Sequence, residues 1–201
     1  MLDYISYGKL DFERTFGASP NDNVTLGNAM IKGYIKGGIT PVAKHFPGYG
    51  DLFFDPHKKQ IVTIDPEGLK INLSTFQKII AANPTVAIMT AHVLIPSVDS
   101  KPATLSSKFL NEILRNKMGF QGVIITDDIG MSSIGNPTVE SSVDAVKAGA
   151  DIIISTNEPK KQIEIFERLK KAVLDGEITE ERIDESVSRI LILKSTLEKS
   201  I

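Results

Sequence analysis

The stretch KHFPGYGDLFFDPH, from Lys44 to His57, carries two of the three histidines in the chain. Pro56 restrains the preceding Asp55 to an extended conformation, and side chains two positions apart in extended chain point the same way. The Asp55 carboxylate can therefore bond the His57 imidazole, orient it and raise its basicity for proton transfer. The alternative is a solvated surface loop in which this pair has no chemical role.

Two adjacent aspartates, Asp127 and Asp128, follow the apolar run Val123, Ile124 and Ile125. A carboxylate that emerges at the end of a buried strand can act as a nucleophile or stabilise a cation. A carboxylate in the same position can instead cap the helix that follows. We expect one of the two aspartates to be structural.

Lys44 and His45 leave an apolar segment together and lie on opposite faces if that segment is a regular strand. A desolvated lysine at a strand end also permits Schiff-base chemistry, as in an aldolase or lyase. For His92, which follows a second apolar segment, we expect a hydrogen-bonded structural role. No spacing of histidines and carboxylates matches a zinc motif, so no metal site is predicted.

Short apolar segments alternate with helix-like segments along the whole chain. Expected strands cover residues 39–46, 85–93, 122–128 and 150–156. Expected helices cover residues 21–36, 74–82, 106–119, 139–148, 160–175 and 179–197. The strands are continuously apolar, which is typical of parallel strands covered on both faces. The pattern predicts an α/β fold of right-handed β/α units with a parallel sheet.

Two architectures fit this pattern, a doubly wound open sheet and a (β/α)8 barrel. Polar residues follow every expected strand at its carboxyl end, where barrel active sites lie: Lys44-His45, His92, Asp127-Asp128 and Thr156-Asn157. An open sheet concentrates its site at one switch point instead, and no glycine-rich nucleotide motif is present. Because a whole barrel takes about 250 residues, four units predict half of one; the resemblance described below implies the carboxyl-terminal half.

The composition describes an ordinary globular domain of 201 residues with a net charge of −2 and no cysteine. The charge argues against a nucleic-acid partner, and the absence of cysteine excludes disulfides and thiolate metal sites. No apolar run is long enough to span a membrane, and no leader precedes the domain. These features favour a cytoplasmic protein, although an export signal would belong to an upstream half of the barrel.

KHFPGYG…DPH, together with ILRNKMGFQGVIITDDIGM, resembles glycoside hydrolase family 3, in particular its bacterial β-N-acetylhexosaminidase branch. The stretch Ile113 to Gly130 resembles the family's active-site signature, and ERTFG, Glu13 to Gly17, resembles the branch sequence Glu-Arg-Ser-Phe-Gly. The resemblance extends from about residue 2 to residue 195. It identifies residues 1–201 as a partial TIM-barrel catalytic domain that lacks the first half of the barrel.

The resemblance implies a role for six residues. Asp127 corresponds to the catalytic nucleophile, His57 to the general acid/base and Asp55 to the partner of His57; Arg14, Lys44 and His45 correspond to the groups that bind the N-acetylated sugar. The implied reaction is retaining removal of terminal N-acetyl-β-D-hexosamine from cell-wall or chitin-derived saccharides, without a cofactor. Phosphate as acceptor in place of water stays open, because the family includes phosphorolytic members.

Tyr49 and Pro56 stand where the branch has histidine and serine, and the family's first half-barrel supplies an Asp and an Arg that have no counterpart here. A half-barrel has two open sheet edges and an apolar inner face. We therefore expect self-association or a partner chain that completes the barrel. Two other functions stay open, a noncatalytic remnant or assembly module and the Lys44-dependent aldolase or lyase.

Overall fold

The structure, a computed structural model, describes residues 16, 19–49, 62–63, 66–84, 86–135, 138–156 and 158–198. Its main sheet has the strand order β1-β3-β5-β6, and every neighbouring pair is parallel. The strands are β1 (Val42–Phe46), β3 (Ala87–Thr90), β5 (Ile124–Asp128) and β6 (Ile152–Ile154). This arrangement confirms the predicted parallel α/β fold with its four strand–helix units.

A second, two-stranded parallel sheet was not predicted. It pairs β2 (Val62–Thr63) with β4 (Val93–Leu94). The expected strand 85–93 was therefore too long, because its apolar run is shared between β3 and β4. His92 lies in the short connection between these strands, where its ring can reach β5.

The helices occupy the predicted places in the chain. They are α1 (Pro20–Lys36), α2 (Pro66–Ala82), a π-helical segment (Lys108–Lys117), α3 (Glu140–Ala148), α4 (Pro159–Leu174) and α5 (Glu180–Glu198), with short 3-10 turns at Ala103–Leu105 and Ser132–Ile134. One boundary was wrong, because α2 begins at Pro66 and not at residue 74. Pro66 suits a first helical turn, and the turns that follow bury Leu69 against the same core as Phe76.

Helix α1 shows how local sequence sets these boundaries. The Ser19 hydroxyl accepts a hydrogen bond from the Asp22 amide at 3.4 Å, and Pro20 occupies the first turn. At the other end the chain leaves the helix through Gly37 and Gly38, the latter at φ 71°. Glycine adopts that conformation without the strain that a Cβ would add.

The core lies between the main sheet and its helices. Phe46 of β1 meets Phe76 of α2 edge to face, with ring centroids 5.4 Å apart. Ile88 of β3, Ile124 of β5 and Phe109 of the π-helical segment are also fully buried in the same cluster. The burial of these strand residues explains why the strands read as continuous apolar runs in the sequence.

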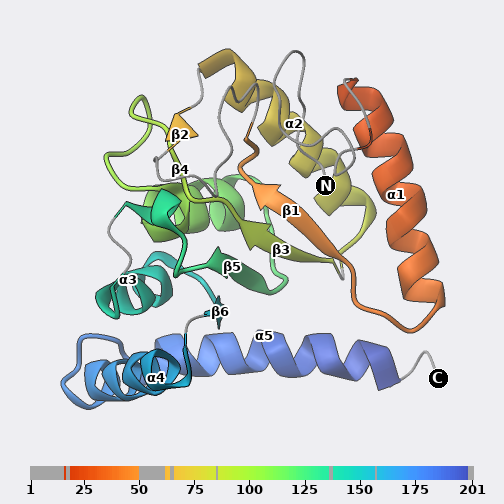
Figure 1. Ribbon diagram of the computed structural model, residues 1–201. Coiled ribbons are helices and arrows are strands. Elements are labelled where there is room, and N and C mark those ends of the chain that lie inside the picture. Colours follow the sequence, from red (N-terminus) through yellow and green to blue (C-terminus); the bar gives the residue numbers. More distant parts are fainter. Residues whose placement is uncertain are drawn as a thin grey trace.

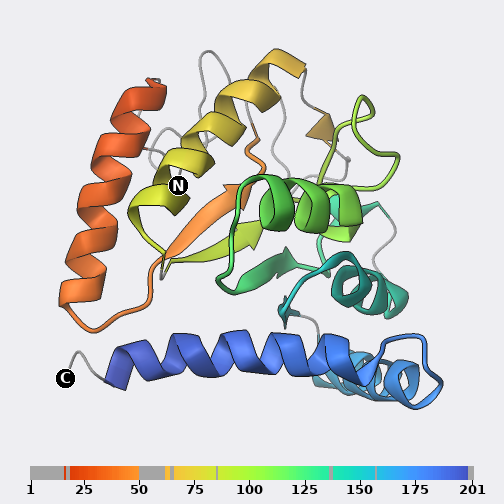
Figure 2. The same ribbon diagram turned by 180° about the vertical axis from the view of Figure 1, so that it is seen from behind.

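Figures 1 and 2 show α1 and α2 beside β1, and α4 and α5 beyond β6. In the strand order, β1 and β6 each have one neighbour within the described part of the chain. Large apolar side chains are exposed next to both edges: Leu26, Met30, Tyr34, Ile35, Ile39 and Val42 near β1, and Ile163, Phe166, Leu174, Val187, Leu191 and Ile192 on α4 and α5. Within the described ranges, no helix is long and apolar enough to cross a membrane.

Candidate active site

The candidate site lies where β1 and β5 end. Both strands are parallel members of one sheet, so their carboxyl ends reach the same edge. There the His45 Nε2 atom lies 3.7 Å from Asp127 Oδ2, and their side chains are 6% and 19% exposed. This distance exceeds that of a hydrogen bond but places an ionisable ring beside a carboxylate that solvent reaches.

Asp127 and Asp128 have different environments. Asp128 accepts hydrogen bonds at Oδ1 from the amides of Gly130 (3.0 Å) and Thr156 (3.1 Å), and at Oδ2 from the Thr156 hydroxyl. Among the described residues, Asp127 receives one hydrogen bond, from the Asp128 amide to Oδ1 at 2.9 Å. The expectation that one aspartate is structural therefore fits the geometry, with Asp128 bonding the end of β5 to the chain after β6.

The hydrogen bonds of Asp128 keep it ionised. Burial favours its neutral form, but the Thr156 hydroxyl and the amides of Gly130 and Thr156 outweigh burial and lower its pKa. A carboxylate that accepts three hydrogen bonds has little remaining capacity to attack an electrophile. Asp127, with Oδ2 directed toward His45, is the better candidate nucleophile.

His92 is fully buried behind the two aspartates. Its Nε2 atom lies 2.8 Å from the carbonyl oxygen of Asp128, and Nδ1 lies 2.9 Å from the Thr104 hydroxyl. Burial lowers its pKa below 6.5, although the Asp128 carbonyl and the charges of Asp127 and Asp128 act in the opposite direction. The expected hydrogen-bonded histidine is confirmed, and its neutral form is favoured.

Tyr49, which stands where the branch has histidine, packs in the protein interior. Its ring is 1% exposed and lies 5.0 Å from the His45 ring, centroid to centroid. Gly48 makes this turn possible, with φ 107° and so little space that a Cβ would lie 2.3 Å from Cγ of Asn72. The residue where the branch has histidine therefore supports the ring that faces Asp127.

The structure brings together two of the six predicted site residues, His45 and Asp127. Lys44 is half-buried on the same strand and borders a groove between α1 and β1. Arg14, Asp55 and His57 lie outside the described residues. Within the described ranges, no group of three or more His, Cys, Asp or Glu could hold a metal ion.

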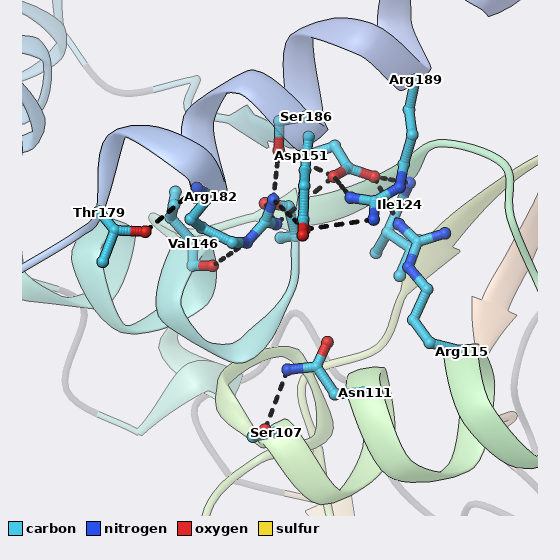
Figure 3. Close-up of polar contacts among 12 residues, drawn as sticks. Ser107, Asn111, Arg115, Ile124, Val146, Asp151, Thr179, Arg182, Ser186 and Arg189 are labelled. Atoms are coloured by element: carbon cyan, nitrogen blue, oxygen red, sulfur yellow. Dashed lines mark hydrogen bonds and ion pairs between the residues drawn. The ribbon is translucent and has the colours of Figure 1, made fainter.

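A cluster of charged side chains lies at the opposite end of the sheet, away from the candidate site (Figure 3). Asp151, fully buried just before β6, accepts from Arg115 at 2.7 Å, from Arg189 at 3.0 Å and from Ser186 at 2.8 Å, and pairs with Arg182 at 3.4 Å. It also accepts the amide of Ile124 at the start of β5 at 2.9 Å. The cluster bonds α5 and the π-helical segment to the amino ends of two strands, where conserved polar groups in barrels serve stability.

Sequence reasoning missed two parts of this arrangement. It did not foresee that Thr104 holds the His92 ring, or that three arginines, one from the π-helical segment and two from α5, converge on Asp151. For Asp151, its place in front of an apolar strand, between Ala150 and Ile152, was the available signal. For Thr104 the sequence carries no such signal, because a threonine in a loop is ordinary.

Comparison with known proteins adds an independent line of evidence. Residues 11–193 match the family described as Glycosyl hydrolase family 3 N terminal domain. A Haemophilus influenzae protein named beta-hexosaminidase is 37% identical over 169 residues, covering 79% of this chain and 46% of that protein. Its counterpart in Actinobacillus pleuropneumoniae serotype 5b is 35% identical over 162 residues, covering 79% and 47%.

A solved structure shows the same similarity in three dimensions. The glycoside hydrolase family 3 beta-N-acetylglucosaminidase of Paenibacillus sp. str. FPU-7 superposes with a TM-score of 0.92 at 36% identity, covering 98% of this chain and 39% of that one. The strand order and the β/α succession of this chain thus occur within a larger catalytic fold. The chain spans about half the length of the curated relatives it matches.

Proposed function

The chain belongs to glycoside hydrolase family 3, and on that premise we propose that it carries the nucleophile of a retaining exo-glycosidase acting on terminal N-acetyl-β-D-hexosamine. The observation that carries this proposal is the contrast between the two aspartates. Asp128 is engaged at both carboxylate oxygens, whereas Asp127 points one oxygen at His45 from the carboxyl end of β5. Such a carboxylate suits attack on an anomeric carbon.

In the first step, an Asp127 oxygen forms a bond to the anomeric carbon while the bond from that carbon to the leaving oxygen breaks. The leaving oxygen takes its proton from His57, whose assignment rests on the Asp55-Pro56-His57 motif. In the second step His57 removes a proton from water, which attacks the anomeric carbon and releases Asp127. Two displacements at one carbon retain the β configuration, as in other retaining glycosidases.

His45 and Lys44 are proposed to bind the sugar, together with Arg14. For His45, the 3.7 Å approach to Asp127 Oδ2 supports this role, because a group there touches both the nucleophile and the substrate. The ring is held from behind by Tyr49. N-acetylglucosamine is the proposed sugar, since similar proteins are named beta-hexosaminidase and beta-N-acetylglucosaminidase, and the proposed sources are cell-wall or chitin-derived saccharides.

We further propose that the active form is a barrel completed by four more β/α units. Two observations support this arrangement. Among the described strands, β1 and β6 each pair with one neighbour, and apolar side chains are exposed beside each of them. Coverage of only 46–47% of the curated relatives supports it too. Residues 1–201 then form one partial catalytic domain rather than a complete one.

The two other functions receive less support. A Lys44-dependent aldolase would not explain the match to a glycoside hydrolase family over residues 11–193. A noncatalytic assembly module remains the alternative that the experiment below separates from the enzyme, because it predicts association without turnover.

The experiment measures hydrolysis of an aryl N-acetyl-β-glucosaminide by the full chain. The chain is assayed by itself and together with the segment of the Haemophilus influenzae relative that it does not match. The Asp127→Asn variant is the blank under both conditions. Turnover above the blank, with one covalent sugar trapped on Asp127 by a fluorosugar, supports the proposal. A complex that forms but does not exceed the blank would favour the noncatalytic module.

A further inference from the structure

Asp128 is held at each of its polar groups. Its amide donates to Asp127 Oδ1, its carboxylate accepts from Gly130 and Thr156, and its carbonyl oxygen accepts from His92 at 2.8 Å and from the Met131 amide at 3.0 Å. The Asp128 backbone therefore cannot shift without breaking hydrogen bonds. Because the Asp127 carboxylate is bonded to that backbone, its position follows from the position of Asp128.

The bond from His92 comes from a different part of the chain. His92 lies between β3 and β4, 36 positions before Asp128, and its ring is fully buried. A carbonyl oxygen only accepts, so Nε2 carries the proton in this contact. On the other side of the ring, Thr104 Oγ1 lies 2.9 Å from Nδ1 and 2.8 Å from the Thr90 hydroxyl.

We propose that His92 is a positioning residue for the Asp127 carboxylate: its Nε2–H holds the Asp128 carbonyl and thereby sets where the carboxylate oxygens meet the sugar. This inference rests on the proposed role of Asp127 as nucleophile. Nucleophilic attack tolerates little displacement, since a misplacement of about 1 Å costs on the order of 100-fold in rate. The favoured neutral ring holds this position without adding a positive charge beside the nucleophile.

Two amide substitutions separate the two ring nitrogens. In His92→Gln the side-chain amide nitrogen reaches about as far as Nε2, so the donor to the Asp128 carbonyl is kept. In His92→Asn the amide reaches only as far as Nδ1, so the contact with Thr104 is kept and the donor to Asp128 is lost. Both variants bury a neutral amide, which matches them for charge.

In the completed enzyme, we expect His92→Asn to lower kcat/KM on an aryl N-acetyl-β-glucosaminide about 100-fold through kcat, with KM little changed. His92→Gln should stay within about 10-fold of the wild type. Equal losses in the two variants, or a loss confined to KM, would overturn the inference. Wild-type turnover no faster than Asp127→Asn would instead contradict the proposed function.

A second readout does not depend on turnover. In NMR spectra of the full chain, His92→Asn should shift the Asp128 amide and the Asp127 carboxyl carbon, whereas His92→Gln should leave both near their wild-type positions. Unchanged resonances in His92→Asn would overturn the inference. If His92→Asn fails to fold, Thr104→Val is the substitute, because it removes the hydroxyl that holds Nδ1. Thr104→Val should shift the same two resonances. Unchanged resonances in this variant would also overturn the inference.

Discussion

At the scale of single residues, the pair Asp127 and Asp128 shows how neighbouring identical side chains acquire different chemistry. The Asp128 carboxylate accepts hydrogen bonds from Gly130 and Thr156, whereas one oxygen of Asp127 is directed toward His45. The difference arises because alternate residues of β5 face different surroundings. Asp128 bonds Thr156, which follows β6, whereas Asp127 Oδ2 lies 3.7 Å from His45 of β1.

Substitution of Asp127 and substitution of Asp128 should therefore have opposite effects, the first on chemistry and the second on stability. Asp127→Asn should abolish trapping by a fluorosugar and change the free energy of unfolding by less than about 0.5 kcal/mol, because the asparagine oxygen can still accept the hydrogen bond from the Asp128 amide. Asp128→Ala should cost roughly 1–3 kcal/mol, because it removes a charged acceptor of hydrogen bonds from three groups. Urea unfolding of the full chain measures both, and equal costs would contradict this difference.

The lowered pKa of His92 predicts a pH dependence of stability. The unfolded state has the ordinary value near 6.5 and takes up a proton that the folded ring resists. Stability is therefore highest above about pH 6.5 and falls as the pH drops below it. Asp127, Asp128 and His45 are the ionisable groups that act on this ring.

Urea unfolding of wild type and His92→Gln at pH 7.5 and pH 5.5 checks this expectation. The wild type should lose more free energy of unfolding over this interval than the variant, which has no titrating group at position 92. The difference between the two losses isolates His92 from the other histidines. A variant with the same pH dependence as the wild type would show that His92 does not contribute.

At the scale of elements, the two ends of the sheet serve different purposes. The carboxyl ends carry Asp127 and His45, whereas the amino ends carry Asp151 with its three arginines. Arg115 from the π-helical segment also donates to the carbonyl oxygens of Phe120 and Gly122. Burial, the largest influence, lowers its pKa to about 10 despite the attraction of Asp151.

Asp151→Asn tests how far the position of α5 depends on this cluster. We expect a cost of roughly 3–5 kcal/mol in the free energy of unfolding, because buried arginines lose their counter-ion. The matched control is Asp175→Asn, which removes an exposed partner of Lys171 and should cost about 0–1 kcal/mol. Similar midpoints for the two variants in thermal unfolding would argue against a dominant role for the buried cluster.

At the scale of the whole molecule, the exposed apolar side chains gather at both edges of one sheet. They lie on α1 and near β1 at one edge and on α4 and α5 at the other (Figures 1 and 2). A groove of about 510 Å³ between β6 and α4, lined by Ile153, Phe166 and Leu169 among others, continues the second surface. Apolar surface in two such places is typical of a protein that buries it against further β/α units.

Charges placed in these surfaces should weaken association and leave the fold intact. Met30 is 47% exposed on α1 and Leu191 is 59% exposed on α5. Met30→Glu and Leu191→Glu should each reduce binding to the complementary half-barrel segment by about 10-fold or more, which corresponds to ~1.4 kcal/mol. Lys147→Glu, on exposed α3 surface, is the control for added negative charge.

Titration by analytical ultracentrifugation measures these affinities. Unchanged binding in both edge variants, alongside unchanged binding in the control, would place the interface elsewhere. Self-association that is lost in the edge variants would identify a second copy of the chain as the partner.

The sequence by itself determined the element types and their order. Continuous apolar strands and the helix stop at Gly37-Gly38 depend on a few neighbouring residues, so they can be read locally. The sequence also predicted that His45 and Asp127 lie at one edge of the sheet, because strand ends in parallel sheets gather there, and the two side chains lie 3.7 Å apart. Boundaries that depend on packing were wrong, as at the start of α2 and the end of β3, and the two-stranded sheet of β2 and β4 was not predicted.

The tertiary structure decided that the Asp128 carboxylate accepts hydrogen bonds at both oxygens and which segments donate them. Thr156 lies 28 positions from Asp128, His92 lies 36, and the arginines around Asp151 come from 31 to 38 positions away. Hydrogen bonds over such separations depend on strand register and side-chain packing, which no local pattern encodes. For that reason the family resemblance could single out Asp127 in the sequence, but the physical difference between Asp127 and Asp128 required the fold.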